Sequence, residues 1–215
     1  MNYTIEKIIT YEVTRQTFII NLDNNERYIF KYGNFDSSAL KLISEHDLPH
    51  IARILDVTDK SMLAEFVNGN SLDEIFIPTT DVYNIIIQLC DALSSLHKID
   101  VLYLDMKPDN IVLDDHGNVT LIDFENAVKT ENIYRRLFFL GFSPNYSAPE
   151  LRNAEGATER SDIYSLGMTI SAILNDDIKS PPLKAIVERC TALHPEMRYA
   201  SVDELKKDIL KTAKM

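Results

Sequence analysis

The chain has 215 residues, of which 45% are apolar and 26% are charged, with only 6 Gly and 8 Pro. This composition excludes a disordered chain, a collagen-like repeat and a disulfide scaffold, and it predicts one globular protein with an apolar core. Lys and Arg number 22 against 33 Asp and Glu, and the formal net charge of −11 disfavours non-specific binding to nucleic acid or to anionic lipid.

The first third of the chain has an apolar period close to two, which is typical of β-strands. The turn signal Asp23-Asn24-Asn25 separates two of these runs, so an antiparallel meander is expected. A short helical pattern over 35–46 follows the third run, and Asn68-Gly69-Asn70 ends the segment. Strands are predicted over 6–13, 17–22, 26–32, 51–57 and 61–66.

After residue 70 the apolar period changes to 3.6, which predicts a mainly helical second part. The most regular helix covers 81–97, with Thr80 or Asp81 as its N-cap. A capping box over Ser201–Glu204 opens the last helix. The later helices are predicted over 162–174, 182–193 and 201–211.

The segment Val101–Glu150 has no strong helical pattern, and long ordered loops usually carry function. It contains Asp105, Lys107 and Asn110, followed after a predicted hairpin by Asp123. Phosphoryl transfer needs a carboxylate to orient and deprotonate the acceptor, oxygen ligands for Mg²⁺, and a cation that offsets charge on the transferring group. This segment supplies each type of residue.

Cys90 and Cys190 lie inside apolar helical patterns and are expected to be buried thiols, which fits a reducing compartment. No apolar run reaches the length of about 18 residues that a membrane span needs. The first residues, 1–6, lack the basic and apolar regions of a secretory signal. A cytoplasmic location is therefore expected, without a membrane partner, and the oligomeric state stays open.

Five short motifs follow one another from Tyr103 onward. Residues 103–110 read Y-L-D-M-K-P-D-N and 123–125 read D-F-E. Further on, 146–150 read Y-S-A-P-E, 161–167 read S-D-I-Y-S-L-G, and Arg198 follows H-P-E-M. In this order they resemble the catalytic loop H-R-D-L-K-P-E-N, the D-F-G, the A-P-E, the S-D-x-W-S-x-G and the A-P-E-pairing Arg of eukaryotic-like (Hanks-type) Ser/Thr protein kinases.

The resemblance spans nearly the whole chain and implies the bilobal α+β fold of that family. Residues 1–215 would form a single protein-kinase-like domain. It would have a small antiparallel-sheet N-lobe over about 1–66, a hinge over about 65–70 and a mainly helical C-lobe over about 71–215.

The resemblance also implies roles for four residues of the long segment. Asp105 would be the catalytic base, and Lys107 would steady the γ-phosphate. Asn110 and Asp123 would hold Mg²⁺. The expected substrates are ATP and a protein or peptide that presents a Ser or Thr hydroxyl.

In the first lobe, Tyr28-Ile29-Phe30-Lys31 resembles the V-A-I-K strand, so Lys31 would hold the α- and β-phosphates of ATP. Residues 62–67, Met-Leu-Ala-Glu-Phe-Val, resemble the hinge. Backbone groups of Glu65 and Val67 would meet the adenine edge, and Ala64 would be a small gatekeeper.

Other matched residues are implied to be structural. Glu150 would pair with Arg198, and Asp162 would accept backbone hydrogen bonds from the catalytic loop, so that its loss would misplace Asp105. His97, at the end of the long helix, is interpreted as a packing residue and not as a ligand.

Two departures from the family concern the first lobe. No glycine occurs between Ile8 and Leu22, whereas Gly lets backbone N–H groups approach phosphates closely, so residues 11–17 must cover ATP differently or not at all. The family's lysine-pairing Glu should fall near Ala39. Glu45 or Asp36 could take its place, although neither has the expected spacing.

Two more departures concern the second lobe. Tyr103 and Leu104 replace the family's His and Arg, so the Arg that reads a phosphate in the activation segment is absent. Activity is therefore expected not to need phosphorylation there. Replacing any one hydroxyl-bearing residue of the activation segment should therefore change activity only mildly. These residues are Thr130, Tyr134, Ser143 and Ser147. Glu125 replaces the Gly of D-F-G, and Ile-Asp-Phe-Glu resembles the corresponding motif of choline kinases and of the kinase domains of lantibiotic-type synthetases. Glu125 would be a Mg²⁺ contact or a solvated side chain.

Three functions remain open from the sequence. An active Ser/Thr protein kinase is favoured, because the catalytic residues are all present. A small-molecule kinase of the choline or aminoglycoside type is favoured by the D-F-E motif and opposed by the A-P-E motif and Asp162. A pseudokinase that serves as a scaffold is favoured by the missing glycines and the unmatched helix Glu.

Overall fold

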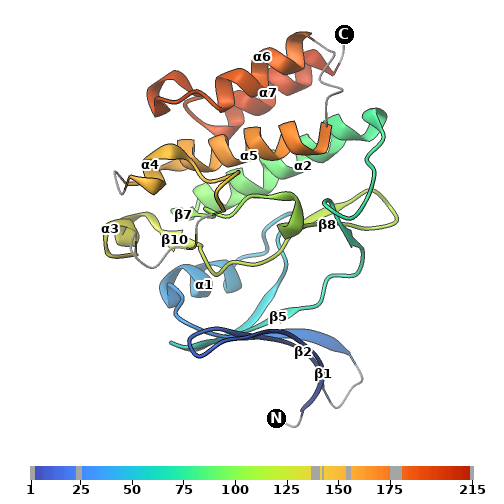
Figure 1. Ribbon diagram of the computed structural model, residues 1–215, viewed down its shortest axis with the longest axis vertical. Helices are drawn as coiled ribbons and strands as arrows, with labels where there is room; N and C mark the ends of the chain where they lie inside the picture. The colour runs from blue at the N-terminus through green and yellow to red at the C-terminus, as the bar shows by residue number, and fades with distance from the viewer. Residues whose placement is uncertain are drawn as a thin grey trace.

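The chain folds into a sheet-bearing lobe and a helical lobe, stacked along the long axis of the molecule (Figure 1). Strand β1 lies at one end and the last helix, α7, at the other. The bilobal α+β fold class predicted from the sequence is confirmed. The computed structural model describes residues 3–22, 26–136, 141, 143–153, 156–174 and 181–213.

Five antiparallel strands form the N-lobe sheet in the order β1-β2-β3-β5-β4, and α1 packs against β4. The alternation of buried and partly exposed side chains is clearest in β5, where Met62 and Ala64 are buried and their neighbours are not. The predicted turn at 23–25 lies outside the described residues. The elements are β1 (Tyr3–Tyr11), β2 (Gln16–Leu22), β3 (Arg27–Tyr32), α1 (Ser37–Ser44), β4 (Ile54–Val57) and β5 (Ser61–Glu65).

Asp36 is the N-cap of α1 and is not available to pair with a lysine of the sheet. Its carboxylate accepts hydrogen bonds from Ser38 N (3.2 Å), Lys129 N (3.1 Å) and Asn132 Nδ2 (3.0 Å). Burial alone would raise the pKa of Asp36, but hydrogen bonds from the Ser38 hydroxyl (2.6 Å), from Asn132 and from Lys129 N outweigh it and lower the pKa. Glu45 is the exposed C-cap of the same helix. The expectation that either residue replaces the family's helix Glu is therefore wrong.

Four long helices make up most of the described C-lobe (Figure 1). Most of the short strands and single helical turns lie between the first two of these helices, but one strand precedes the first helix and one turn lies between the last two. The long helices are α2 (Thr79–His97), α5 (Glu159–Leu174), α6 (Pro181–Cys190) and α7 (Val202–Thr212). The short strands are β6 (Asn70–Ser71), β7 (Val101–Leu102), β8 (Ile111–Leu113), β9 (Val119–Leu121) and β10 (Val128–Lys129). The helical turns are η1 (Pro108–Asn110), η2 (Thr130–Asn132), α3 (Ile133–Arg136), α4 (Pro149–Arg152) and η5 (Pro195–Met197).

Helix α2 begins two residues earlier than its apolar pattern predicts. Pro78 is the N-cap residue and makes no side-chain cap, while the Asp81 N–H donates to its carbonyl. Thr80 and Asp81 lie inside the first turn, so the prediction that one of them caps the helix is wrong. An acidic residue in the first turn still interacts favourably with the helix dipole.

Helix α7 begins with the predicted cap. The Ser201 side chain accepts a hydrogen bond from Glu204 N at 3.2 Å. Glu204 turns back as a capping box requires, but it accepts from the N–H of Ala200 and not from that of Ser201.

One apolar core is centred on α2 and extends into both lobes. Cys90 and Cys190 are buried free thiols, as predicted. Burial raises the pKa of Cys90 to about 12, so this thiol stays protonated and unreactive. Within the described ranges, no helix combines the length and the apolar character that crossing a membrane requires.

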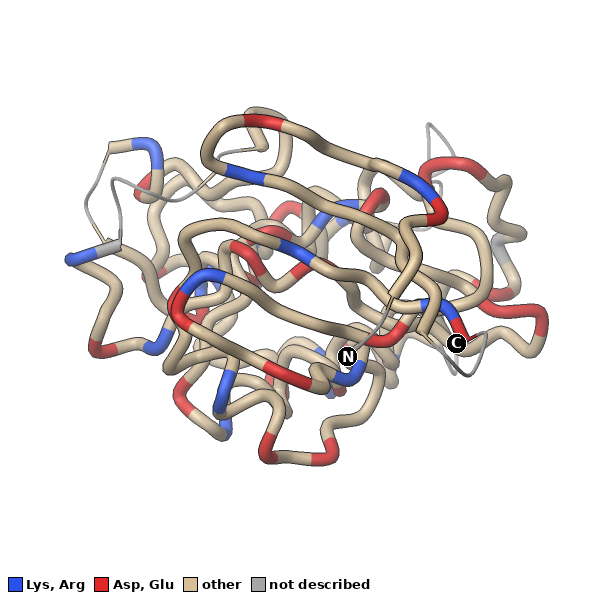
Figure 2. The backbone as a smooth tube through the Cα atoms, turned by 90° about the horizontal axis from the view of Figure 1, so that it is seen from below, with Lys and Arg blue, Asp and Glu red and all other residues tan. Residues whose placement is uncertain are grey.

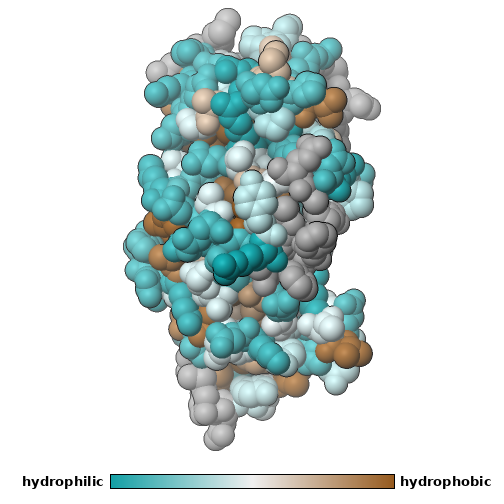
Figure 3. Space-filling model, turned by 90° about the vertical axis from the view of Figure 1, so that its left-hand side faces the viewer, coloured by the Kyte–Doolittle hydropathy of each residue, from teal (hydrophilic) through white to brown (hydrophobic). Residues whose placement is uncertain are grey.

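The surface carries charges of both signs. Seen from the sheet end, acidic and basic residues are interspersed along the N-lobe strands (Figure 2). The side on which α1, α3 and α4 lie is mainly hydrophilic over its described part, with small separate apolar patches (Figure 3). In the view of Figure 2 the acidic residues are thus mixed with basic ones along the chain.

Candidate active site

The start of the catalytic loop is held by Asp162, which is fully buried in α5. Its carboxylate accepts hydrogen bonds from Tyr103 N (2.9 Å) and Leu104 N (2.7 Å), as predicted. Leu104 has a φ of 62°, a conformation that non-glycine residues rarely adopt, so these two bonds offset local strain. His97 Nε2 lies 2.9 Å from the same carboxylate. His97 is thus a polar partner of Asp162 and not only a packing residue.

Asp105 is buried and is contacted by three polar groups. Its Oδ1 accepts a hydrogen bond from Ser143 Oγ at 3.0 Å, and its Oδ2 accepts one from Asn110 Nδ2 at 2.8 Å. Lys107 Nζ lies 3.3 Å from Asp105 Oδ2 and donates to Ser143 Oγ at 3.3 Å. Burial raises the pKa of Asp105, although Lys107 acts in the opposite direction. A carboxylate of this kind is suited to accept a proton from a hydroxyl.

Asp123 follows β9 and faces Lys31 of β3 across the space between the lobes. Lys31 Nζ lies 2.7 Å from Asp123 Oδ1. Burial alone would raise the pKa of Asp123, but Lys31 and, more weakly, Arg15 outweigh it and hold the pKa below its ordinary value. Asp123 is therefore ionised at neutral pH and can serve as a cation ligand.

Glu125 is mostly buried, with 12% of its side chain exposed. Its Oε1 lies 2.9 Å from Lys31 Nζ, and its Oε2 lies 2.5 Å from Arg15 Nε. Of the two expectations for Glu125, the solvated side chain is wrong, because Lys31 of β3 and Arg15 of the β1–β2 turn enclose this carboxylate.

A cavity of about 220 Å³ lies between the lobes, next to these charges. Its apolar walls come from both lobes and include Ala52, Ala64 and Val112. The predicted residues that line it are Lys31, Glu65, Val67, Asn110 and Asp123, joined by Arg15. An apolar slot with charged groups on one side suits a ligand with a flat base and a charged tail.

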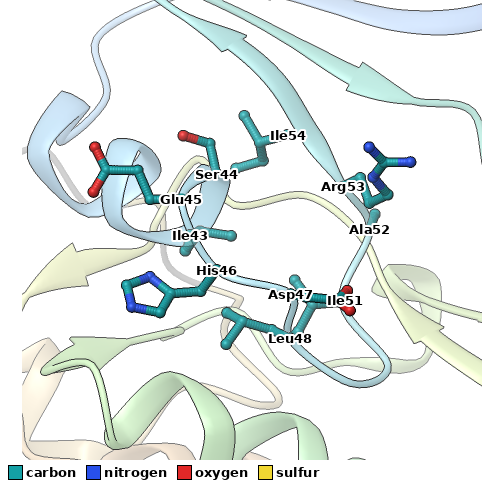
Figure 4. A pocket seen from close by; sticks show the side chains of 10 residues that line it. All are labelled: Ile43, Ser44, Glu45, His46, Asp47, Leu48, Ile51, Ala52, Arg53 and Ile54. Atoms are coloured by element: carbon teal, nitrogen blue, oxygen red, sulfur yellow. The ribbon is translucent and has the colours of Figure 1, made fainter.

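A second hollow, of about 410 Å³, lies at the end of α1 and the start of β4 (Figure 4). Glu45 and Arg53 lie on opposite sides of it, and apolar side chains such as Ile43 lie between them. Apart from Ala52, its lining shares no residue with the cavity between the lobes. The larger space is therefore not the candidate active site.

The donors present fit a magnesium ion that is shared with a nucleotide. Both contacts of Asn110 Nδ2 go to Asp105, one to its carboxylate and one to its backbone carbonyl, which leaves the Asn110 amide oxygen for a metal. Asp123 supplies an ionised carboxylate. Within the part of the chain that the structure describes, no group of three His, Cys, Asp or Glu side chains could hold a metal alone. Mg²⁺ usually binds through one or two protein oxygens together with phosphates and water.

The Glu150–Arg198 pair braces the end of the activation segment, as predicted. Arg198 Nη1 and Nη2 donate to the two carboxylate oxygens of Glu150 at 2.7 and 2.9 Å. Arg198 also donates to the carbonyls of Ala192 and Leu193. Helix α6 ends at Cys190, three residues before the predicted end at Leu193.

Comparisons with known proteins agree with this geometry. The family model described as the protein kinase domain matches residues 37–209, which is most of the chain. The chain belongs to the protein kinase family. The predicted resemblance to Ser/Thr protein kinases is thereby confirmed, and the matched range contains the catalytic loop and Asp123 but begins after Lys31.

Several curated relatives carry kinase names. The Bacillus subtilis Serine/threonine-protein kinase PrkC is 26% identical over 96% of this chain and 37% of its own length. Protein kinase 2 of Dictyostelium discoideum is 30% identical over 79% of this chain and 35% of its own length. The Serine/threonine-protein kinase CLA4 of Candida albicans is 30% identical over 82% of this chain and 20% of its own length. The chain thus spans between a fifth and somewhat over a third of these relatives.

The structure brings the predicted site residues together in two groups that Asn110 connects. One group is hydrogen-bonded around the catalytic loop and the other lines the cavity. The first contains Asp105, Lys107 and Asn110, and the second contains Lys31, Glu65, Val67, Asn110 and Asp123.

Three contacts were not predicted from the sequence, those of Arg15, Ser143 and Glu125. The sequence gives a hint of two of them, because Arg15 and Glu125 are charged residues in segments where the family has glycine. Ser143 was expected to tolerate replacement, yet it touches both Asp105 and Lys107.

Proposed function

We propose that this chain transfers the γ-phosphoryl group of ATP to a Ser or Thr hydroxyl of a protein or peptide. The observation that carries the proposal is the contact of Asp105 with a hydroxyl. Ser143 Oγ donates to Asp105 Oδ1 at 3.0 Å, with Lys107 Nζ 3.3 Å from that hydroxyl. A substrate hydroxyl that approached the same carboxylate beside Ser143 would have a proton acceptor and a nearby cation at once.

Each residue of the site has one task in this reaction. The substrate oxygen attacks the γ-phosphorus while its proton passes to Asp105, and the bond between the γ-phosphorus and the bridging oxygen breaks to release ADP. Lys107 offsets charge on the transferring group, and Lys31 holds the α- and β-phosphates. Mg²⁺, held by Asn110 and Asp123, would neutralise charge on the phosphates.

The two other candidate functions lack a comparable observation. A small-molecule kinase has no evident need for the brace between Glu150 and Arg198, which supports the segment on which a peptide would lie. A scaffold has no need for a buried carboxylate that contacts a hydroxyl and a lysine, as Asp105 does.

The test is transfer of labelled phosphate from Mg²⁺-ATP to a generic basic protein, compared with choline, aminoglycosides and sugars. Asp105→Asn should lower kcat about 100-fold or more, because general-base catalysis contributes at least that factor. Asp115→Asn, an exposed acidic residue of the β8–β9 turn, is the matched control and should behave as wild type. Label on a small molecule and not on protein, or no ADP release at all, would contradict the proposal.

A further inference from the structure

The carboxylate of Glu125 is shared by two cations of the N-lobe. Lys31 Nζ lies 2.9 Å from Oε1 and Arg15 Nε lies 2.5 Å from Oε2. The Oε1 atom is buried and, within the described residues, has no hydrogen bond of good geometry beyond this ion pair. A buried carboxylate oxygen without its cation would be costly, so Glu125 and Lys31 stabilise each other in this position.

No residue of α1 competes for Lys31. Ala39, at the position of the family's helix Glu, has no carboxylate and is fully buried. Asp36 is taken up by the cap of α1, and Glu45 is exposed at the other end. Within the described ranges, the ion-pair partners of Lys31 are Asp123 and Glu125 alone.

Arg15 lies at the end of the tight β1–β2 turn, which the Glu12 N–H closes by donating to the Arg15 carbonyl. Its guanidinium reaches 2.5 Å from Glu125 and 3.9 Å from Asp123, and the residue lines the cavity. About half of its side chain is exposed, 48%, so a ligand can reach it. The turn therefore presents a charged side chain where the family presents glycine amides.

We propose that Glu125 takes the place of the missing helix Glu and holds Lys31 and Arg15 ready for the phosphates of ATP. The inference rests on the proposed function. When Asp123 serves the metal, Lys31 needs another counter-charge to stay in place, and Glu125 is the carboxylate within reach. The same residue orients Arg15, so that side-chain cations compensate for the absent glycine loop.

This arrangement changes which part of the structure determines the position of Lys31. In most protein kinases the lysine–glutamate pair depends on the position of the helix that carries the Glu. Here the carboxylate lies two residues after Asp123, on the same segment as the metal ligand. The placement of Lys31 is therefore independent of a displacement of α1.

The experiment compares ATP kinetics and Mg²⁺ dependence of wild type, Glu125→Gln and Glu125→Asp in transfer to a basic protein. Glu125→Gln should raise the KM for ATP about tenfold or more, with a smaller change in kcat, because one charge-assisted contact is lost. It should also raise the Mg²⁺ concentration needed for half-maximal rate, because Lys31 then pairs with Asp123 alone. Glu125→Asp keeps the charge and should recover part of the loss.

Two further variants complete the design. Glu45→Gln removes an acidic residue of α1 that contacts neither cation, and it should stay within twofold of wild type. Arg15→Gln changes a half-exposed side chain with little risk to folding and should raise the KM for ATP severalfold. Thermal unfolding checks that each variant is folded.

The outcomes separate this inference from the proposed function. If Lys31→Met impairs transfer while Glu125→Gln and Arg15→Gln match wild type in KM and Mg²⁺ dependence, the role of Glu125 is refuted and the proposed function stands. If wild type transfers no phosphate, both are refuted. A large loss of transfer activity in Glu45→Gln would indicate that an acidic residue of α1 pairs with Lys31, and it would also overturn the inference.

Discussion

Replacing Asp162 by Asn should release the start of the catalytic loop while keeping the size of the side chain. The carboxylate is fully buried and accepts the N–H groups of Tyr103 and Leu104. An asparagine offers one acceptor oxygen in place of two. One of the two buried N–H groups therefore loses its acceptor, and the other loses a charged one.

The magnitude follows from these two bonds. A hydrogen bond to a charged group contributes about 1.5–3 kcal/mol, and a buried donor left without a partner costs about 1–3 kcal/mol. We expect the free energy of unfolding to fall by about 3 kcal/mol. For a chain of this length 1 kcal/mol corresponds to about 2–4 °C, so the Tm should fall by about 6–12 °C.

The substitution should lower kcat much more than it changes the KM for ATP. Because Leu104 directly precedes Asp105, loss of the left-handed turn displaces the base, and kcat should fall about tenfold or more. The KM for ATP should change little, because Lys31 is on the other lobe. Calorimetric unfolding and steady-state kinetics measure the two effects.

Glu159→Gln is the matched control for Asp162→Asn. Glu159 lies in the same helix and approaches His97 at 3.6 Å, but its side chain is 45% exposed. Its loss should shift the Tm by no more than about 1–2 °C, as for other exposed pairs. An Asp162→Asn protein with the Tm and kcat of this control would refute the reasoning.

Three other substitutions test separate parts of the structure. Ser143→Ala should lower kcat severalfold, because the catalytic carboxylate loses a hydrogen-bond donor, and unchanged kinetics would show that the contact is idle. Glu150→Gln should lower the Tm at neutral pH. Burial alone would raise the pKa of Glu150, but Arg198 holds it below its ordinary value. The stability from this pair is therefore present above about pH 4.3 and lost as the pH falls further, so the Tm difference should vanish in acid. Gly167→Ala should destabilise the chain by about 1–3 kcal/mol in denaturant unfolding, because a Cβ there would meet Cys190 Cβ at 2.5 Å.

The residues of the catalytic loop could be predicted because their spacing along the chain fixes their geometry. Asp105, Lys107 and Asn110 lie within six residues, and one turn, η1, places them around the same point. Asp162 was also predicted, although it lies far along the chain, because its motif resembles a known one.

The contacts of Arg15 and Glu125 could not be predicted in the same way. They join segments 110 residues apart, and the periodicity of apolar residues does not predict which charged side chains pair across a cavity. The sequence does show a charge where the family has glycine, but it does not show that the two charges pair. The prediction of the α2 N-cap was wrong for a local reason. Pro78 can precede a helix without offering a side-chain acceptor, so the helix begins before Thr80 and Asp81.

The central claim is that this chain binds Mg²⁺-ATP between its lobes, and calorimetric titration of the purified protein tests it most directly. We expect binding that requires Mg²⁺, that is lost in Asp123→Ala and that is retained in Asp115→Ala. A matching rise in Tm with ligand should accompany it, because binding stabilises the native state. Absence of binding at millimolar ATP, or equal binding by wild type and Asp123→Ala, would contradict the account.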